Sequence, residues 1–176
     1  MSCKCRLKYF PKQLYHYNQV AKNAKQFVID YLKKNKKKDT SNLGVVLDID
    51  ETVLRTYCWK CHTQMHKMEV TPIKKFYNWC VKNNISVFFI TARPDKGLDW
   101  TREQLKEFGM DNYIELYLKP NAYNNTTAGL QNYKSDVRKF IVRNKEFKIL
   151  INIGDQKHDL NGGFAMKKFL LNPDMT

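Results

Sequence analysis

Apolar residues recur every three or four positions through residues 12–34, which is the spacing of one face of an α-helix. The residues of this face are Leu14, Tyr17, Val20, Ala21, Ala24, Phe27, Val28, Tyr31 and Leu32. Pro11 precedes them, near a position where helices commonly begin. The pattern therefore predicts an N-terminal helix over residues 12–34, which passes into the lysine-rich linker KKNKKKDTSN.

Five later segments have the pattern of β-strands. They are LGVVLDI at 43–49, ISVFFITA at 85–92, YIELYL at 113–118, FKILINIG at 147–154 and the short KKFLL at 167–171. The first two are continuous apolar runs, which are typical of a parallel sheet that helices cover on both faces.

Helical patterns alternate with these strands. They are PIKKFYNWCVKNN at 72–84, GLDWTREQLKEFG at 97–109 and KSDVRKFIVRNK at 134–145. The second helix is expected to end at Gly109, and the polar stretch 119–133 is expected to be a loop. This alternation predicts an α/β fold with a Rossmann-like, doubly wound, mainly parallel sheet and helices on both faces. A length of 176 residues suits one domain, 1–176.

The overall charge favours anionic partners. The chain has 31 Lys and Arg against 17 Asp and Glu, a net charge of +14, so phosphates and nucleic acid are candidate ligands. A solvated basic surface is the plainer alternative. No apolar run approaches the length of a membrane span, and the basic N-terminus lacks the apolar segment of a secretory signal. We therefore expect a cytoplasmic protein without a membrane partner; the oligomeric state stays open.

Candidate chemistry begins where the first strand ends. Asp48 and Asp50 are two positions apart, so both can face one site, and Thr52 follows them. Two close carboxylates do not both ionise easily, so one can be an anionic nucleophile while the other carries a proton as a general acid. The carboxyl ends of parallel strands are where such sites form.

Three further clusters stand at comparable places. Thr91 and Arg93 follow the second strand, and a hydroxyl with free backbone N–H groups there can hold phosphate oxygens. Lys134 begins a predicted helix, where a cation is favourable only if an anion lies nearby. Asp155 and Asp159 follow the fourth strand, and such oxygen ligands suit Mg²⁺. Each cluster alone has an ordinary structural explanation, but together they describe a phosphoryl-transfer site.

The same segments resemble a known family. LDIDETVL, FFITARP, YKSDVR and NIGDQKHDL are similar, in order, to the four motifs of the haloacid dehalogenase (HAD) superfamily of phosphatases. Together with the terminal FLLNP, they resemble its acid phosphatase branch, which includes bacterial class B and class C acid phosphatases and plant storage-protein-like acid phosphatases. The resemblance covers roughly residues 14–173.

The resemblance implies a Mg²⁺-dependent phosphomonoesterase with an aspartyl-phosphate intermediate. It implies that Asp48 is the nucleophile and Asp50 the general acid and base. Thr91 and Lys134 would bind the phosphoryl oxygens.

The remaining roles that the resemblance implies concern the metal and the supporting residues. Asp48, the backbone carbonyl of Asp50 and Asp155 would bind Mg²⁺. Asp159 would support the metal shell or Lys134, while Thr52 and Arg93 would be supporting residues.

The insert over the site is short, at about 55–71, and therefore predicts a very small cap. Small phosphoesters such as nucleoside monophosphates are the substrates that the resemblance implies. A small cap and the charge of +14 leave nucleic-acid ends as an alternative substrate. A non-catalytic binding or storage protein on the same fold is a third hypothesis, and transfer of the phosphoryl group to an alcohol in place of water is a fourth.

The insert also contains CWKCHTQMH, which includes Cys58, Cys61, His62 and His66. This spacing resembles half of a zinc site, and Cys3 and Cys5 could in principle supply the rest. A redox pair and ordinary thiols are the alternatives. The five cysteines are too few for a disulfide scaffold.

Overall fold

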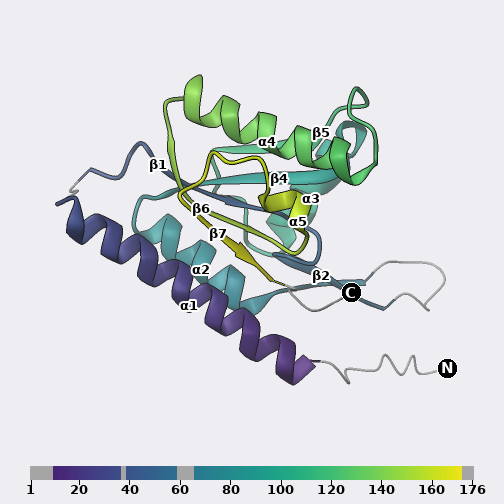
Figure 1. Cartoon of the computed structure of the whole chain (residues 1–176). Coiled ribbons are helices and arrows are strands. Elements are labelled where there is room, and N and C mark those ends of the chain that lie inside the picture. Colours follow the sequence, from purple (N-terminus) through teal and green to yellow (C-terminus); the bar gives the residue numbers. More distant parts are fainter. Residues whose placement is uncertain (1–9, 37–38, 59–65, 172–176) are drawn as a thin grey trace.

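The computed structural model describes the backbone of residues 10–36, 39–58 and 66–171, and the side chains of 13–36, 39–56 and 67–171. Its main sheet has five strands in the order β5-β4-β1-β6-β7 (Figure 1), and every neighbouring pair is parallel. The strands are β1 (Leu43–Leu47), β4 (Ser86–Pro94), β5 (Glu115–Lys119), β6 (Lys148–Gly154) and β7 (Lys167–Leu170). The predicted α/β fold with a mainly parallel sheet is confirmed.

The strand order explains where a site can form. β1 lies at the centre, with β4 on one side and β6 on the other. The chain proceeds outward from β1 to β4 and β5, and then returns to the opposite side of β1 to form β6 and β7. Ligands in such sheets bind beyond the carboxyl ends of the strands at this reversal. A ligand site is therefore expected in the segments that follow β1, β4 and β6.

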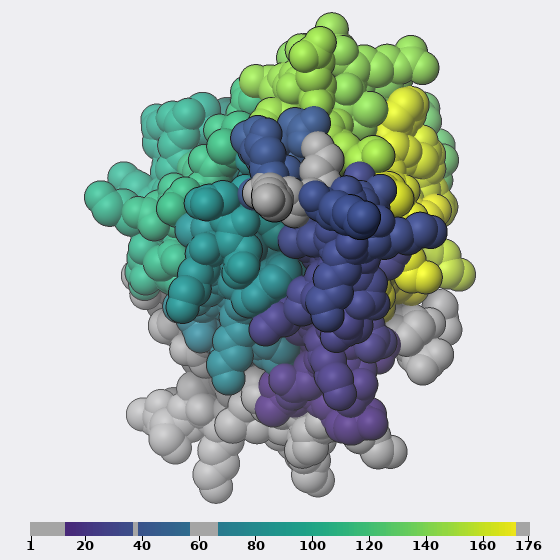
Figure 2. All heavy atoms as spheres, turned by 90° about the vertical axis from the view of Figure 1, so that its left-hand side faces the viewer, coloured from purple at the N-terminus to yellow at the C-terminus, as the bar shows by residue number. Residues whose placement is uncertain are grey.

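Helices cover both faces of the sheet. α1 (Phe10–Lys34) and α2 (Thr71–Lys82) pack on each other below the sheet in Figure 1, and α4 (Thr127–Arg143) lies above it. Figure 2 shows α1 and α2 side by side across one face of the molecule. The short α5 (Lys157–Leu160) contacts α4 and β6. Among the described residues, no helix is both long and apolar enough to traverse a bilayer.

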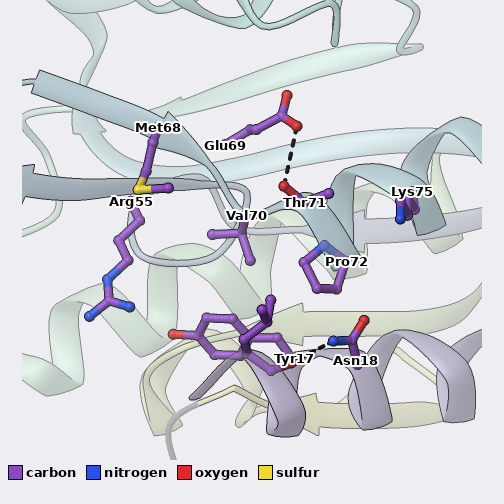
Figure 3. Close-up of a pocket in the computed structure, with 10 residues that line it drawn as sticks. Tyr17, Asn18, Arg55, Met68, Glu69, Val70, Thr71, Pro72 and Lys75 are labelled. Carbon is purple, nitrogen blue, oxygen red and sulfur yellow. Dashed lines mark hydrogen bonds between the residues drawn. The ribbon is translucent and has the colours of Figure 1, made fainter. Parts of the chain in front are cut away.

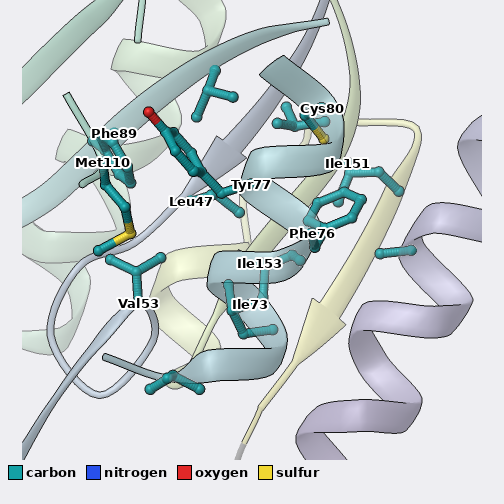
Figure 4. Close-up of a cluster of buried hydrophobic side chains, with 14 of the residues drawn as sticks. Leu47, Val53, Ile73, Phe76, Tyr77, Cys80, Phe89, Met110, Ile151 and Ile153 are labelled. Atoms are coloured by element: carbon teal, nitrogen blue, oxygen red, sulfur yellow. The ribbon is translucent and has the colours of Figure 1, made fainter. Parts of the chain in front are cut away.

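Two hydrophobic clusters follow from the alternation of side chains along β1. Val45 and Leu47 enter the larger cluster beneath α1 and α2, whereas Val46 faces the smaller cluster beneath α4. Figure 4 shows part of the larger cluster, where Leu47 and Phe89 of the sheet lie beside Tyr77 of α2. Each fully buried side chain of this size contributes about 1.5–3 kcal/mol.

The helix ends agree with the sequence in two cases. α1 spans the predicted 12–34 and starts two residues earlier, and its last turn carries Lys33 and Lys34, which favour the negative end of the helix dipole. After the 3₁₀ turn η1 (Asp95–Gly97), α3 (Leu98–Glu107) ends just before Gly109. Gly109 has φ of +64°, a conformation that glycine adopts without strain.

The predicted loop at 119–133 is wrong in its second half. α4 begins at Thr127, and the side chain of Thr126 caps it by accepting a hydrogen bond from the Gly129 backbone N–H. α4 starts with two exposed residues, Thr127 and Ala128, and a buried glycine, Gly129, so the periodic pattern of large apolar residues is absent there. Lys134 consequently lies in the middle of α4, and the prediction that it stands at a helix N-terminus is wrong.

A separate two-stranded sheet forms within the predicted insert. β2 (Leu54–Cys58) and β3 (His66–Glu69) make an antiparallel pair, in which Thr56 lies opposite Lys67. We call β2 and β3 together the hairpin. The backbone N–H of Val70 donates to the carbonyl of Val53 at 2.8 Å, so the two ends of the insert lie together at the core.

Candidate active site

A tight turn follows Asp48 and contains Asp50. The carbonyl of Ile49 accepts hydrogen bonds from the backbone N–H groups of Thr52, Val53 and Leu54, at 3.2, 2.9 and 3.0 Å. Within the turn, Glu51 has φ of +57°, and its carboxylate accepts from the Thr56 N–H at 2.9 Å. The Glu51 side chain therefore stabilises the start of the hairpin.

A buried lysine joins two of the predicted carboxylates. Nζ of Lys134 lies 2.6 Å from Oδ1 of Asp48 and 2.5 Å from Oδ1 of Asp159. The Lys134 side chain is 2% exposed, and Asp48 and Asp159 are buried as well. Asp48, Asp155 and Asp159 each offer an oxygen within 4.8 Å of the others. The structure thus brings together residues from the ends of β1 and β6 and from α4.

Burial dominates the electrostatics of this cluster. It raises the pKa of Asp48 to about 8, although Lys134 opposes the shift. It also raises the pKa of Asp155 to about 6, although a hydrogen bond from Gln156 opposes the shift. Three carboxylates beside one ammonium leave an excess of two negative charges when all are ionised.

The donor set fits a divalent cation. Carboxylate oxygens are the ligands that Mg²⁺ prefers, and the excess charge of the cluster matches its charge. Both oxygens of Asp159 are already engaged, one by Lys134 and the other by the backbone N–H of Gln156 at 2.8 Å. Asp48 and Asp155 are therefore better placed to hold a cation directly than Asp159.

Asp50 lies in a different environment. Arg93 donates to both of its oxygens, from Nε to Oδ2 at 2.7 Å and from Nη2 to Oδ1 at 2.9 Å. Nζ of Lys67 also donates to Oδ1, at 2.8 Å. Burial alone would raise the pKa of Asp50, but Arg93 and Lys67 outweigh it and hold the pKa below its usual value. Before a cation or substrate binds, the acidities are thus the reverse of those expected for an anionic Asp48 and a protonated Asp50.

Arg93 is fixed by its surroundings as well as by Asp50. It accompanies Thr91 at the end of β4 and is 7% exposed. Its guanidinium donates to Gln104 at 2.7 Å and stacks on Trp100, 4.5 Å from the ring centroid. The predicted supporting residue Arg93 therefore contacts Asp50 directly.

The two predicted threonines are both buried. Thr91 is 1% exposed, and its hydroxyl accepts from the Arg93 N–H at 3.2 Å, at the same edge of the sheet as Asp48. Thr52 is fully buried, and its hydroxyl has no hydrogen-bond partner among the described residues.

The sequence-based prediction missed two basic residues of the site, Lys67 and Arg138. Lys67 reaches Asp50 from the hairpin, and no local pattern around it signals this contact. Arg138 is fully buried in α4 and donates to the carbonyls of Asp159 at 2.7 Å, Gly163 at 2.9 Å and Asn161. It forms part of the YKSDVR segment, which was the available signal. Arg138 thus fixes the backbone that carries Asp159.

The predicted zinc or redox cluster falls outside the part of the chain that the structure describes. The residues concerned are Cys61 and His62, together with the side chains of Cys58 and His66. Separately, a cavity of about 260 Å³ lies between α1 and the base of the hairpin (Figure 3). Tyr17, Arg55 and Met68 help to line it, and none of the site residues predicted above does.

A parallel sheet with these clusters beyond the ends of β1, β4 and β6 is a HAD-like arrangement. Residues 57–176 match the family described as HAD superfamily, subfamily IIIB (Acid phosphatase), and the chain belongs to this family. The match begins after Asp48, Asp50 and Thr52, so it does not cover the segment that resembles the first motif.

A solved structure shows the same fold. The class C acid phosphatase from Bacillus anthracis aligns with a TM-score of 0.65 and 17% sequence identity. The alignment covers 87% of this chain and 66% of that chain, so the present chain spans just under two thirds of that protein. No curated protein matches the sequence.

Proposed function

We propose that this protein is a Mg²⁺-dependent phosphomonoesterase that acts through an aspartyl phosphate on Asp48, with small phosphoesters such as nucleoside monophosphates as substrates. The observation that carries the proposal is the buried Lys134, which bonds Asp48 and Asp159 next to Asp155. This cluster lies at the strand ends of a chain that belongs to an acid phosphatase family.

In the first step, a carboxylate oxygen of Asp48 attacks phosphorus, and the bond between phosphorus and the ester oxygen breaks. Asp50 gives a proton to the leaving oxygen, which departs as an alcohol. Lys134 has three N–H donors and uses two of them on Asp48 and Asp159, so a third remains for a phosphoryl oxygen. Thr91 is the second proposed phosphoryl ligand.

In the second step, Asp50 removes a proton from water, which attacks phosphorus and breaks its bond to Asp48. Phosphate leaves, and Asp50 is again protonated. Asp50 enters this step ionised because it gave up its proton in the first step, and its contacts with Arg93 and Lys67 favour the ionised form. A dianionic phosphoryl group beside Asp50 opposes Arg93 and Lys67 and raises its pKa, which suits the acid of the first step.

Asp48, Asp155 and the backbone carbonyl of Asp50 would hold Mg²⁺, with Asp159 in a supporting position. When bound, the ion offsets negative charge on the phosphoryl oxygens and on the carboxylates. Asp48 would then be ionised at neutral pH, because a neighbouring cation lowers the pKa that burial raises.

Hydrolysis of a chromogenic phosphate ester with Mg²⁺ tests this proposal. Asp48→Asn keeps the shape of the side chain and should reduce the rate by at least about a thousandfold, as for loss of a catalytic nucleophile. The matched control is Asp99→Asn, because the Asp99 side chain is 93% exposed. A wild-type rate in Asp48→Asn would contradict the nucleophile, and activity that a chelator leaves intact would contradict the metal.

Nucleic-acid ends are a second candidate substrate, favoured by the net charge of +14 and the small hairpin. Binding of an oligonucleotide with a terminal phosphate, measured over a salt series, distinguishes the two. Contacts to the phosphate backbone predict an affinity that falls steeply with salt. A protein that hydrolyses neither nucleotides nor oligonucleotide ends would instead fit a non-catalytic binding role.

A further inference from the structure

The hairpin places a cation against the proposed proton carrier. Nζ of Lys67 lies 2.8 Å from Oδ1 of Asp50 and 2.7 Å from the hydroxyl of Thr56. The Lys67 side chain is 7% exposed, whereas that of Asp50 is 40% exposed. A lysine that gives up most of its hydration in this way requires partners in fixed positions.

The register of the hairpin determines this contact. Thr56 pairs with Lys67, so the two side chains share one face, and that face turns toward Asp50. Arg55 and Met68, the neighbouring pair, have the opposite orientation and line the cavity beside α1 (Figure 3). The bridge between Asp50 and Leu54 ties the start of the hairpin to the turn after β1.

The two oxygens of Asp50 are not equivalent. Oδ1 accepts hydrogen bonds from both Arg93 and Lys67, whereas Oδ2 accepts only the one from Arg93 among the described residues. A carboxylate oxygen has two lone pairs. Oδ1 is therefore saturated, and Oδ2 keeps one lone pair for a proton.

We propose that Lys67 is a positioning residue, which holds Oδ1 of Asp50 so that Oδ2 is the oxygen that carries the proton. The proposal rests on the proposed function, because it assigns an orientation to the general acid and base. Lys67 itself neither gives nor takes a proton in this scheme. Its role is to occupy the second lone pair of Oδ1, which Arg93 alone leaves open, so that the proton goes to Oδ2.

Leaving groups of different basicity separate this role from a structural one. A poor leaving group, such as the alkoxide of an alkyl phosphate, needs the general acid more than p-nitrophenolate does. The value of kcat/KM reports the step in which the leaving group departs. Loss of Lys67 should therefore affect alkyl phosphates more than p-nitrophenyl phosphate.

The experiment compares Lys67→Met, Lys67→Arg and the control Lys75→Met, which removes one exposed lysine outside the site. For Lys67→Met we expect kcat/KM to fall about tenfold with an alkyl phosphate and less than about threefold with p-nitrophenyl phosphate. Lys67→Arg should recover most of the loss, and Lys75→Met should match wild type. Urea unfolding of each variant shows whether the fold is retained.

The results that would contradict the role of Lys67 differ from the result that would contradict the proposed function. Equal losses on both substrates, with no recovery in Lys67→Arg, would overturn the positioning role in favour of a merely structural contact. Wild-type rates in Lys67→Met would overturn it as well. A wild-type protein that hydrolyses neither ester would instead overturn the proposed function.

Discussion

Lys134 and Asp48 are 86 positions apart in the chain, yet Nζ of the lysine lies 2.6 Å from Oδ1 of the aspartate. α4 delivers the lysine across the sheet to the end of β1, where burial removes both groups from water. Lys134 is also the counter-charge of Asp159, at 2.5 Å, so its removal would leave buried negative charge unpaired.

Lys134→Met should therefore destabilise the protein as well as inactivate it. Removal of the ammonium leaves Asp48 and Asp159 without a counter-charge, and we expect a loss of about 3 kcal/mol in the free energy of unfolding at pH 7. Urea unfolding measures this loss. Lys139→Met on the same helix is the control, because Lys139 is exposed, and equal stability of the two variants would refute the prediction.

Arg138→Met should destabilise the segment after β6. Three hydrogen bonds from Arg138 to backbone carbonyls would be lost, although the carbonyl of Asp159 would keep the Asn152 side chain as a donor. At about 1 kcal/mol for each lost hydrogen bond, the expected loss in the free energy of unfolding is about 3 kcal/mol. Hydrogen exchange should increase at residues 159–163 in particular. Arg102→Met, at a side chain that is 57% exposed, should change neither quantity.

Gly154→Ala tests how closely β6 approaches Asp159. A Cβ at position 154 would lie 2.4 Å from the Cβ of Asp159, so the two segments must separate. Asp159 would then lose its contact with Lys134, and we expect phosphatase activity to fall more than about tenfold. Gly97→Ala is the matched control, since its Cβ would only meet Trp100 at 3.9 Å. Comparable activity in the two variants would contradict a close approach that matters for the site.

Tyr77 should make stability depend on alkaline pH. Burial raises its pKa from 10.0 to about 12, and its hydroxyl both donates to and accepts from the backbone of Asn112. Because the folded pKa is the higher one, the contribution of Tyr77 is complete below pH 10 and is lost as the pH rises toward 12.

Tyr77→Phe removes this dependence. At pH 8 the variant should be less stable than wild type by about 1–2 kcal/mol, because two hydrogen bonds are lost. At pH 11 the difference in stability should shrink by about 1 kcal/mol. Ionisation of Tyr77 stabilises the unfolded state of the wild type at this pH, whereas the variant has no phenol to ionise. Urea unfolding at both pH values checks this against Tyr15→Phe, at a residue that is 68% exposed. A difference that is the same at both pH values would exclude the shifted pKa.

The strands and the carboxylates were predictable because their signals are local. A continuous apolar run such as LGVVLDI predicts a buried parallel strand, and the carboxyl ends of such strands meet at one edge. This rule alone places Asp48 near Asp155. The two-residue spacing of Asp48 and Asp50 was expected to turn both toward one site, but β1 ends at Leu47, and Asp50 lies in the turn after it, where it pairs with Arg93.

The start of α4 and the contacts of the hairpin were not predictable from local signals. The first turn of α4 has no periodic set of large apolar residues, so the cap at Thr126, not periodicity, marks where the helix begins. Lys67 reaches Asp50 only because β2 and β3 pair in one register, and a shift by one residue would turn Lys67 to the other face. Arg93 was expected near the site, but its pairing with Asp50 depends on side chains of α3 that hold it.

The hydrogen bond between Val70 and Val53 has an evolutionary consequence. A segment whose ends meet at 2.8 Å closes on itself, so its length can change at little entropic penalty and without moving the sheet. Related sequences can therefore differ in the length of this insert, provided that the pairing of β2 and β3, which sets Lys67 against Asp50, is kept. Substrate range could diverge through such changes in length while the residues at the strand ends are inherited unchanged.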